Sequence, residues 1–125
     1  MVFVFGSNLS GYHGSGSAKY ALDHCGAIMY QGEGLQGDSY ALPTVGKNIR
    51  KMSFVRVKKY IDNFLEYAKA HPEFEFKVTQ VGCKRAGFTV EQIAPLFASA
   101  SDNCYFDTAW KDILGDTKKY WGTYA

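Results

Sequence analysis

The fold of this chain is decided near its start, by residues 2–18, which read VFVFGSNLSGYHGSGSA. Residues 2–5 are a short apolar run, which predicts a strand covered on both faces. A glycine-rich turn follows, and residues 18–24 are predicted to form a helix that stops before Gly26. A strand, a glycine-rich turn and a helix in this order favour an α/β fold.

Strands and helices are expected to alternate along the rest of the chain. Strands are predicted at residues 27–30, 39–42, 74–81 and 104–106, and a helix at 53–70, where apolar residues recur at helical spacing. Thr89 and Gln92 predict a capping box for a helical segment, with Pro95 either inside it or at its start. We therefore expect a single α/β domain over residues 1–125, with a mixed central sheet of about five strands between helices. Residues 107–125 are an aromatic C-terminal extension for which the sequence predicts no particular secondary structure.

Composition excludes several classes of protein. Of the 125 residues, 46% are hydrophobic, which excludes a disordered chain, and no apolar run approaches the roughly 20 residues of a membrane span. The net charge of +2 argues against a nucleic-acid partner. Cys25, Cys83 and Cys104 fit neither a disulfide framework nor a zinc site, and residues 1–5 do not resemble a signal peptide. We expect a cytoplasmic protein with no metal, no cofactor and no membrane partner.

Glycine is distributed unevenly, with eight of the 13 glycines between Gly6 and Gly37. Ligands of α/β sheets bind in loops beyond the carboxyl ends of strands. Three loops are predicted to have that position, at residues 6–17, 31–38 and 82–88.

The loop at residues 6–17 has the composition of an anion cradle. Its glycines let a ligand approach the backbone, and the helix that follows presents unpaired N–H groups to a phosphate. The spacing fits neither the Rossmann fingerprint nor the P-loop. The alternative is a tight turn that needs left-handed backbone. His13, inside this loop, is a candidate ligand contact or proton donor.

The loop at residues 82–88 also follows a predicted strand and precedes a helical segment. Lys84 and Arg85 could add charge beside a second phosphate, and Phe88 could stack on a base or sugar. Alternatively, Gly87 caps a turn, Phe88 joins the core and the two cations face water. Cys83 is either a nucleophile or a small packed residue.

Together these loops carry a resemblance to a known family. Asn8, the run of residues 14–18 that opens a helix, and residues 78–83 followed by Gly87 resemble the macro-domain pattern. Within that family they are most similar to the branch of terminal ADP-ribose protein glycohydrolases. The chain also resembles a small family of phage and prophage proteins, through residues 5–9, 31–37, 40–44 and 93–97.

The macro-domain resemblance implies a ligand of the ADP-ribose type and a role for each loop. The first loop would meet the phosphates through its backbone, with Asn8 directed at the distal ribose. The second would line the opposite side, with Phe88 closing over the ribose. Residues 31–38 would form a third wall, in which Glu33 or Gln36 bonds a ribose hydroxyl. The residues expected to bind ligand are Ser7, Asn8, His13, Gly14, Ser15, Gly16, Gly32, Glu33, Gly34, Gln36, Gly82, Cys83, Lys84, Ala86, Gly87 and Phe88.

One departure from the glycohydrolase pattern bears on catalysis. Ala86 stands where that branch has an aspartate in its second loop, and alanine cannot transfer a proton. Lys47 lies roughly where the nucleophilic lysine of the branch would be, and Glu33 and Asp38 are the nearby carboxylates. Because cleavage of a glycosidic bond generally needs a carboxylate or an activated water, we favour binding over hydrolysis.

Three functions are therefore open. The chain binds ADP-ribose or an NAD-derived nucleotide, including cyclic ones, and in a phage would sequester a defence signal. Alternatively it is a glycohydrolase that removes ADP-ribose from a macromolecule, using Lys47, Glu33 or Asp38. In the third hypothesis it is a non-catalytic homo-oligomer, formed through the aromatic side chains Tyr105, Trp110, Tyr120, Trp121 and Tyr124.

Overall fold

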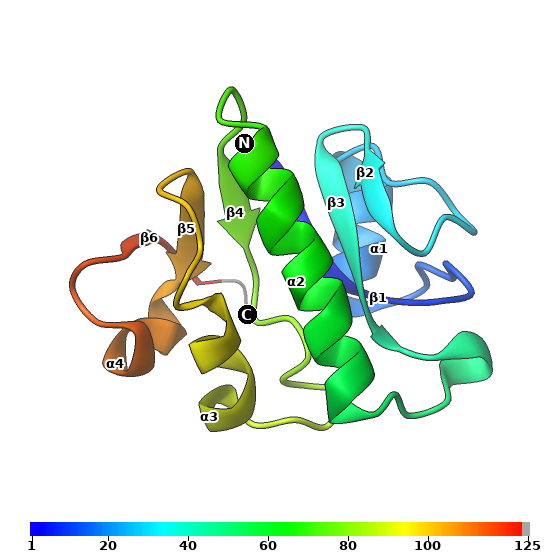
Figure 1. Cartoon of the computed structure of the whole chain (residues 1–125). Coiled ribbons are helices and arrows are strands. Elements are labelled where there is room, and N and C mark those ends of the chain that lie inside the picture. Colours follow the sequence, from blue (N-terminus) through cyan, green and yellow to red (C-terminus); the bar gives the residue numbers. More distant parts are fainter. Residues whose placement is uncertain (124–125) are drawn as a thin grey trace.

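Six strands form one sheet in the computed structural model, which describes residues 1–123 (Figure 1). From one edge to the other they are β2 (Gly34–Gln36), β3 (Ser39–Val45), β1 (Val2–Asn8), β4 (Phe76–Val78), β5 (Cys104–Asp107) and β6 (Lys119–Gly122). β2 pairs antiparallel with β3, and all other neighbours are parallel. The predicted α/β fold with a mixed sheet is confirmed, with one strand more than expected.

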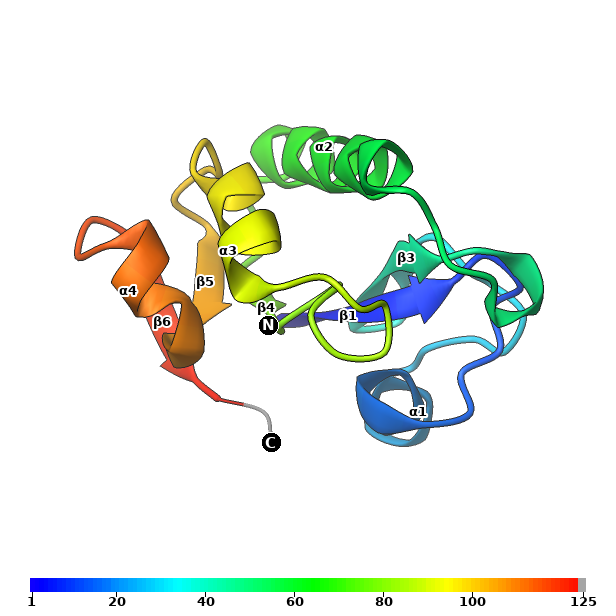
Figure 2. The same cartoon turned by 90° about the horizontal axis from the view of Figure 1, so that it is seen from below.

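Helices cover both faces of this sheet. They are α1 (Gly16–His24), α2 (Phe54–Ala70), α3 (Val90–Ile93) and α4 (Lys111–Leu114), with short 3₁₀ turns η1 (Lys47–Ile49), η2 (Ala94–Phe97) and η3 (Thr108–Trp110). Figure 2 shows α1 on one face and α2 and α3 on the opposite face. No helix within residues 1–123 is both long and apolar enough to cross a bilayer.

The first strand is buried on both faces, as its apolar run predicted. Val2 and Val4 belong to the large core cluster that includes the buried side chains of α2. Phe3 and Phe5 belong to a second, smaller cluster with Ala21 of α1. Because successive side chains of a strand point to opposite faces, β1 joins the two layers of helices.

The helix signals in the sequence are also confirmed. Ser53 is the N-cap of α2, and its hydroxyl accepts the N–H of Arg56 at 3.3 Å. The buried face of α2 consists of Val57, Ile61, Phe64 and Ala68. Thr89 and Gln92 form the predicted capping box of α3, after which the chain tightens into η2, with Pro95 near its start.

Other expected elements need correction. Residues 27–30 are not a strand, because the Ala27 N–H bonds to Ala21 O and the Tyr30 N–H bonds to Gly11 O, away from any strand. The strand that precedes β3 in the chain and pairs with it is instead β2, inside the predicted loop. The strand expected at 74–81 is only Phe76–Val78, and the C-terminal extension supplies η3, α4 and β6.

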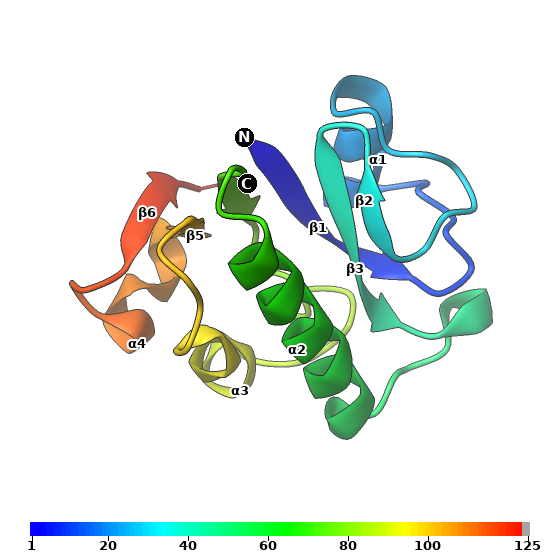
Figure 3. The same cartoon turned by 45° about the horizontal axis from the view of Figure 1, so that its top comes forward.

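The order of the strands determines where a ligand site can form. β1 lies between β3 and β4, with α1 behind the sheet and α2 in front of it (Figure 3). The chain thus passes over one face of the sheet between β1 and β3, and over the other face between β3 and β4. Ligands of open α/β sheets bind at such a reversal, beyond the carboxyl ends of the strands.

Candidate ligand-binding site

A cavity of about 530 Å³ lies beyond the carboxyl ends of β1, β3 and β4. Its first wall is formed by residues 6–8, 12 and 14–18, from β1 to the start of α1. The second wall comes from the end of β3 and from η1, through Thr44, Val45 and Ile49. The third follows β4, at residues 79–82 and 84–86. The volume is within the range typical of small-molecule sites.

The start of α1 leaves its backbone N–H groups available to a ligand. Ser15 is the N-cap, but its side chain makes no capping hydrogen bond, and no acidic residue lies in the first turn. Gly16 has φ of +59°, and a Cβ added there would have no atom within 4 Å. The first N–H groups of a helix have no intrahelical partner, and the helix dipole makes this end attractive to anions. The wall at residues 14–18 can therefore bind a phosphate.

Two cations line the opposite wall. Lys84 and Arg85 are exposed, and neither has an ion-pair partner within residues 1–123. None of the described residues that line the cavity is an aspartate or a glutamate. The cavity therefore has a net positive lining, which favours an anionic ligand.

The loop at residues 82–88 is only partly directed at the cavity. Gly82 and Ala86 line it, whereas Cys83, Gly87 and Phe88 do not. The Cys83 thiol donates to Val81 O at 3.5 Å, and burial, with a smaller contribution from Glu91, raises its pKa to about 11. A thiol with this pKa is protonated at neutral pH and is a poor nucleophile. Phe88 is 9% exposed and belongs to the core cluster.

Asn8 lines the cavity, but most of its amide is already engaged. Its Oδ1 accepts the Tyr12 N–H at 3.1 Å, and its Nδ2 donates to Tyr12 O at 3.0 Å. Ser7 also lines the cavity, and its hydroxyl donates to Gly32 O at 2.5 Å. Both side chains thus position the loop, and the Asn8 amide keeps one N–H for a ligand.

Residues 31–38 do not form the expected wall. Glu33 and Gly34, like Gly32 and Gln36, are absent from the lining of the cavity. Gln36 is 2% exposed, and its Oε1 accepts from Ile28 N–H at 2.8 Å. Its Nε2 donates to the Gln31 and Gly34 carbonyls at 3.0 and 3.3 Å. This segment therefore supports the first loop from behind.

His13 is part of that support. It is fully buried and does not line the cavity. Its Nε2 lies 3.1 Å from both Gln31 O and Gln36 Oε1, and its ring meets Phe5 edge-on at 5.1 Å between centroids. Since both partners of Nε2 accept hydrogen bonds, this nitrogen is the donor, and His13 joins residues 31–36 to the first loop.

The second wall, from the end of β3 and η1, has no counterpart among the predicted loops. Asn48 and Ile49 of η1 have φ of +54° and +58°, although neither is a glycine. Tyr12, Thr44, Thr79 and Gln80 also line the cavity, although the sequence did not single them out as binding residues. Only the position of residues 44–49, just beyond the strand predicted at 39–42, could have indicated this wall.

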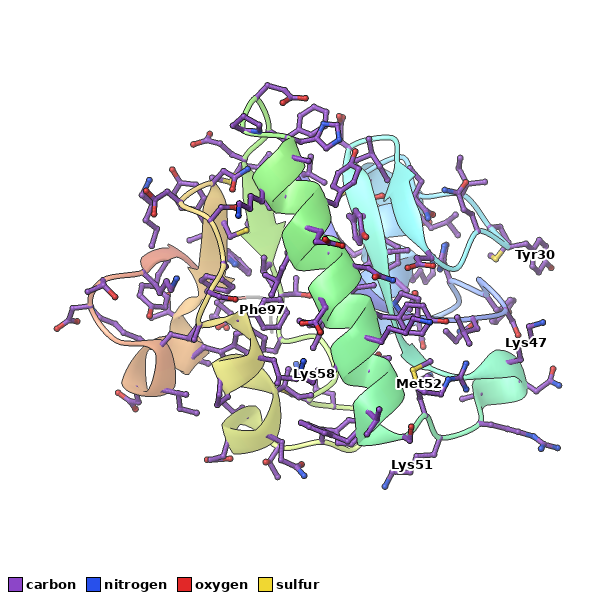
Figure 4. The ribbon with its side chains drawn as sticks, viewed as in Figure 1. Tyr30, Lys47, Lys51, Met52, Lys58 and Phe97 are labelled. Carbon is purple, nitrogen blue, oxygen red and sulfur yellow. The ribbon has the colours of Figure 1, made fainter. Side chains whose placement is uncertain are left out.

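The candidate catalytic residues are spread outside the cavity. Lys47 is exposed on η1 and lies at the edge of the molecule in Figure 4. The Glu33 carboxylate accepts from Asn63 Nδ2 at 3.5 Å, and Asp38 is exposed in the turn between β2 and β3. None of the three lines the cavity.

Much of the aromatic C-terminal extension contacts its own chain. Trp110 is fully buried, and the Tyr120 hydroxyl donates to Gly115 O at 2.6 Å. Trp121 Nε1 donates to Val78 O at 2.9 Å, while Lys77 Nζ lies 4.5 Å from the centroid of its ring. Tyr124 lies outside the described residues. Across residues 1–123, no three His, Cys, Asp or Glu side chains are grouped so that they could hold a metal ion.

No protein-family model, curated protein or solved structure matches this chain. The chemistry of the cavity therefore follows from three features of its own. These are the uncapped start of α1, the two cations and a lining without carboxylates among the residues described.

Proposed function

We propose that this chain binds an ADP-ribose-type nucleotide in the cavity and does not hydrolyse it. The observation that carries the proposal is the lining of the cavity: the uncapped N-terminus of α1 on one wall, Lys84 and Arg85 on another, and no carboxylate among the described lining residues. The diphosphate would lie at the start of α1, between these walls.

The anionic part of the ligand follows from electrostatics. The N-terminus of a helix carries roughly half a positive charge, and its N–H groups point outward along the axis. Hydrogen bonds from Lys84 and Arg85 to phosphate oxygens would be charge-assisted and therefore stronger than neutral ones. A carboxylate in the lining would repel such a ligand, and none of the described lining residues carries one.

The nucleotide part of the proposal rests on the resemblance to macro domains. That resemblance is carried by the two loops that supply the first and third walls. The further idea, that binding sequesters an NAD-derived defence signal for a phage, rests on the resemblance to phage and prophage proteins.

Binding is favoured over hydrolysis because no described residue that lines the cavity offers a carboxylate to move a proton at the glycosidic bond. A general acid or base must come within hydrogen-bond reach of the reacting atoms. Ala86 lines the cavity at the position of the glycohydrolase aspartate, and Lys47, Glu33 and Asp38 lie outside it. The serine, threonine and tyrosine hydroxyls of the lining are weak acids and bases without an adjacent activating group.

Calorimetric titration with ADP-ribose, its cyclic isomers and NAD, followed by chromatography of each mixture, tests the proposal. We expect heat of binding and recovery of intact nucleotide. Gly16→Glu places a carboxylate at the start of α1 and should abolish the heat. Gly34→Glu is the matched control, because Gly34 also has positive φ and open space but lies outside the cavity.

Two results would contradict the proposal, and a third would remove the support that Gly16→Glu gives it. Absence of heat with every nucleotide would remove the ADP-ribose assignment. Equal loss in Gly16→Glu and Gly34→Glu would show that the loss reflects folding rather than the cavity. Recovery of cleaved nucleotide would replace binding by hydrolysis.

A further inference from the structure

An exposed aromatic ring stands at the rim of the cavity. Tyr12 is 53% exposed and lines the cavity, and the two hydrogen bonds of the Asn8 amide fix its backbone. The Tyr12 ring packs against Gly14. A Cβ on residue 14 would lie 2.3 Å from Tyr12 Cε1, so the ring can take this position only because residue 14 is a glycine. The position of Tyr12 is therefore built into the loop, although its ring is largely open to solvent.

A strained aliphatic residue lines the same cavity. Ile49 is 61% exposed, and its φ of +58° is a conformation that β-branched residues rarely adopt. The turn that holds it is closed by hydrogen bonds from Gly46 N–H to Arg50 O and from Arg50 N–H to Lys47 O. Backbone strain of this kind persists where the surrounding structure enforces it, often at ligand clamps.

The two loops that carry Tyr12 and Ile49 are joined to each other. The Asn48 N–H donates to the Ser10 hydroxyl at 3.1 Å, across 38 positions of sequence. The bond fixes the position of η1 relative to the first loop. Tyr12 and Ile49 thus belong to connected segments that line one cavity, and both side chains are largely exposed there.

We infer that Tyr12 and Ile49 hold the planar base of the nucleotide at the mouth of the cavity, while the phosphates lie deeper, at the start of α1. This inference rests on the proposed function and adds the part of the ligand that gives selectivity. Aromatic rings stack on the faces of bases, and an aliphatic side chain packs against a planar ring. The site would therefore distinguish nucleotides from sugar phosphates that lack a base.

The test compares two ligands that share a ribose phosphate and differ in the base. ADP-ribose is titrated by calorimetry, and ribose 5-phosphate by the shift of the Gly16 amide resonance. In Tyr12→Ala the dissociation constant for ADP-ribose should rise about 5- to 150-fold, the range of base–aromatic stacking. For ribose 5-phosphate it should change less than about twofold, within the effect of a surface substitution that leaves the binding contacts intact.

Three further variants separate stacking from folding. Tyr12→Phe should keep the affinity for ADP-ribose, because it keeps the ring. Ile49→Gly removes the side chain and the strain together, so it should weaken ADP-ribose binding while raising the melting temperature. Tyr30→Ala is the matched control, because Tyr30 is also an exposed tyrosine, at 75%, but does not line the cavity; it lies at the edge of the molecule in Figure 4.

The outcomes distinguish this inference from the proposed function. If the wild type binds ADP-ribose and Tyr12→Ala binds it equally well, the base lies elsewhere and only this inference fails. If Tyr12→Ala weakens both ligands by the same factor, Tyr12 shapes the loop and does not contact the base. If the wild type binds neither ligand, the proposed function fails and this inference fails with it.

Discussion

Two glycine-rich regions of this protein contribute to the proposed site in different ways. The cavity loop (residues 9–17) faces the proposed ligand site, and the support segment (residues 25–38) packs behind it. Gly16 of the first and Gly37 of the second have the same φ of +59°, yet a Cβ on Gly16 would meet nothing, whereas one on Gly37 would lie 2.7 Å from the Gly26 backbone. Glycine content alone therefore does not distinguish a ligand cradle from tight packing of backbone.

The polar groups of the two regions differ in the same way. In the support segment, Gln36 is buried and uses both its oxygen and its nitrogen on protein partners, one of which is His13. In the cavity loop, Ser15 and the backbone at the start of α1 have no capping side chain. Satisfied polar groups fix a structure, while unsatisfied ones at a cavity are available to a ligand.

The largest effect should come from comparing Gly37→Ala with Gly16→Ala. Both variants force alanine into left-handed backbone, at about 1–2 kcal/mol. Gly37→Ala also pushes a methyl group against the Gly26 backbone, which adds about 1–3 kcal/mol. Urea unfolding should show Gly37→Ala as the less stable variant, and equal losses would contradict the difference between the two regions.

Gln36→Leu should be the next most damaging change. It removes the side-chain partners of the Ile28 N–H and of the Gln31 and Gly34 carbonyls, and we expect a loss of about 2–3 kcal/mol in the free energy of unfolding. Glu33→Gln, an exposed change in the same segment, serves as the control and should stay within about 0.5 kcal/mol. Nucleotide affinity of the folded Gln36→Leu fraction should be retained; a specific loss of binding at full stability would place Gln36 in the site.

Lys84→Ala and Arg85→Ala test the cavity side of the comparison. Each should weaken binding of ADP-ribose about tenfold, because a charge-assisted hydrogen bond is lost, and should leave stability unchanged. Lys47→Ala is matched in charge and exposure but lies outside the cavity, so its calorimetric titration should equal that of the wild type. If Lys47→Ala lost affinity while Lys84→Ala and Arg85→Ala kept it, the result would favour the glycohydrolase hypothesis.

The last effect is confined to high pH and concerns the Cys83 thiol, which burial keeps protonated. Its pKa rises from an ordinary value of 9.0 to about 11, so the folded state holds a proton that the unfolded state loses. The contribution of the raised pKa to the free energy of unfolding is complete below pH 9 and is lost as the pH rises toward 11. The difference in unfolding free energy between wild type and Cys83→Ala should narrow across that window. A constant difference would mean that the thiol is open to the cavity after all.

The fold was largely predictable because its main elements carry local signals. The apolar run of β1, the helical spacing of α2 and the capping box at Thr89 each depend on neighbouring residues alone. β2 was missed because glycines at both ends made it indistinguishable from a loop. β6 was missed because Tyr120 and Trp121 are fixed by Gly115 O and Val78 O, contacts that no local pattern reveals.

The site was predictable only in part. The loops at residues 6–17 and 82–88 were expected to meet, and both line the cavity. The wall at Thr44, Val45 and Ile49 was not expected, because it carries a single glycine and gains its position from the strand order. Cys83 and Phe88 could not be assigned to cavity or core from the sequence. In a loop, a shift of the backbone by one residue is enough to reverse the direction of a side chain.

The central claim is that the diphosphate of a nucleotide binds at the start of α1, and amide chemical shifts test it most directly. ¹⁵N-labelled protein would be titrated with ADP-ribose while all backbone amides are followed. We predict that the largest shifts occur at residues 14–18 and 82–86, with small shifts at residues 31–38. Shifts concentrated at 31–38, or none at 14–18 at saturating ligand, would contradict the account.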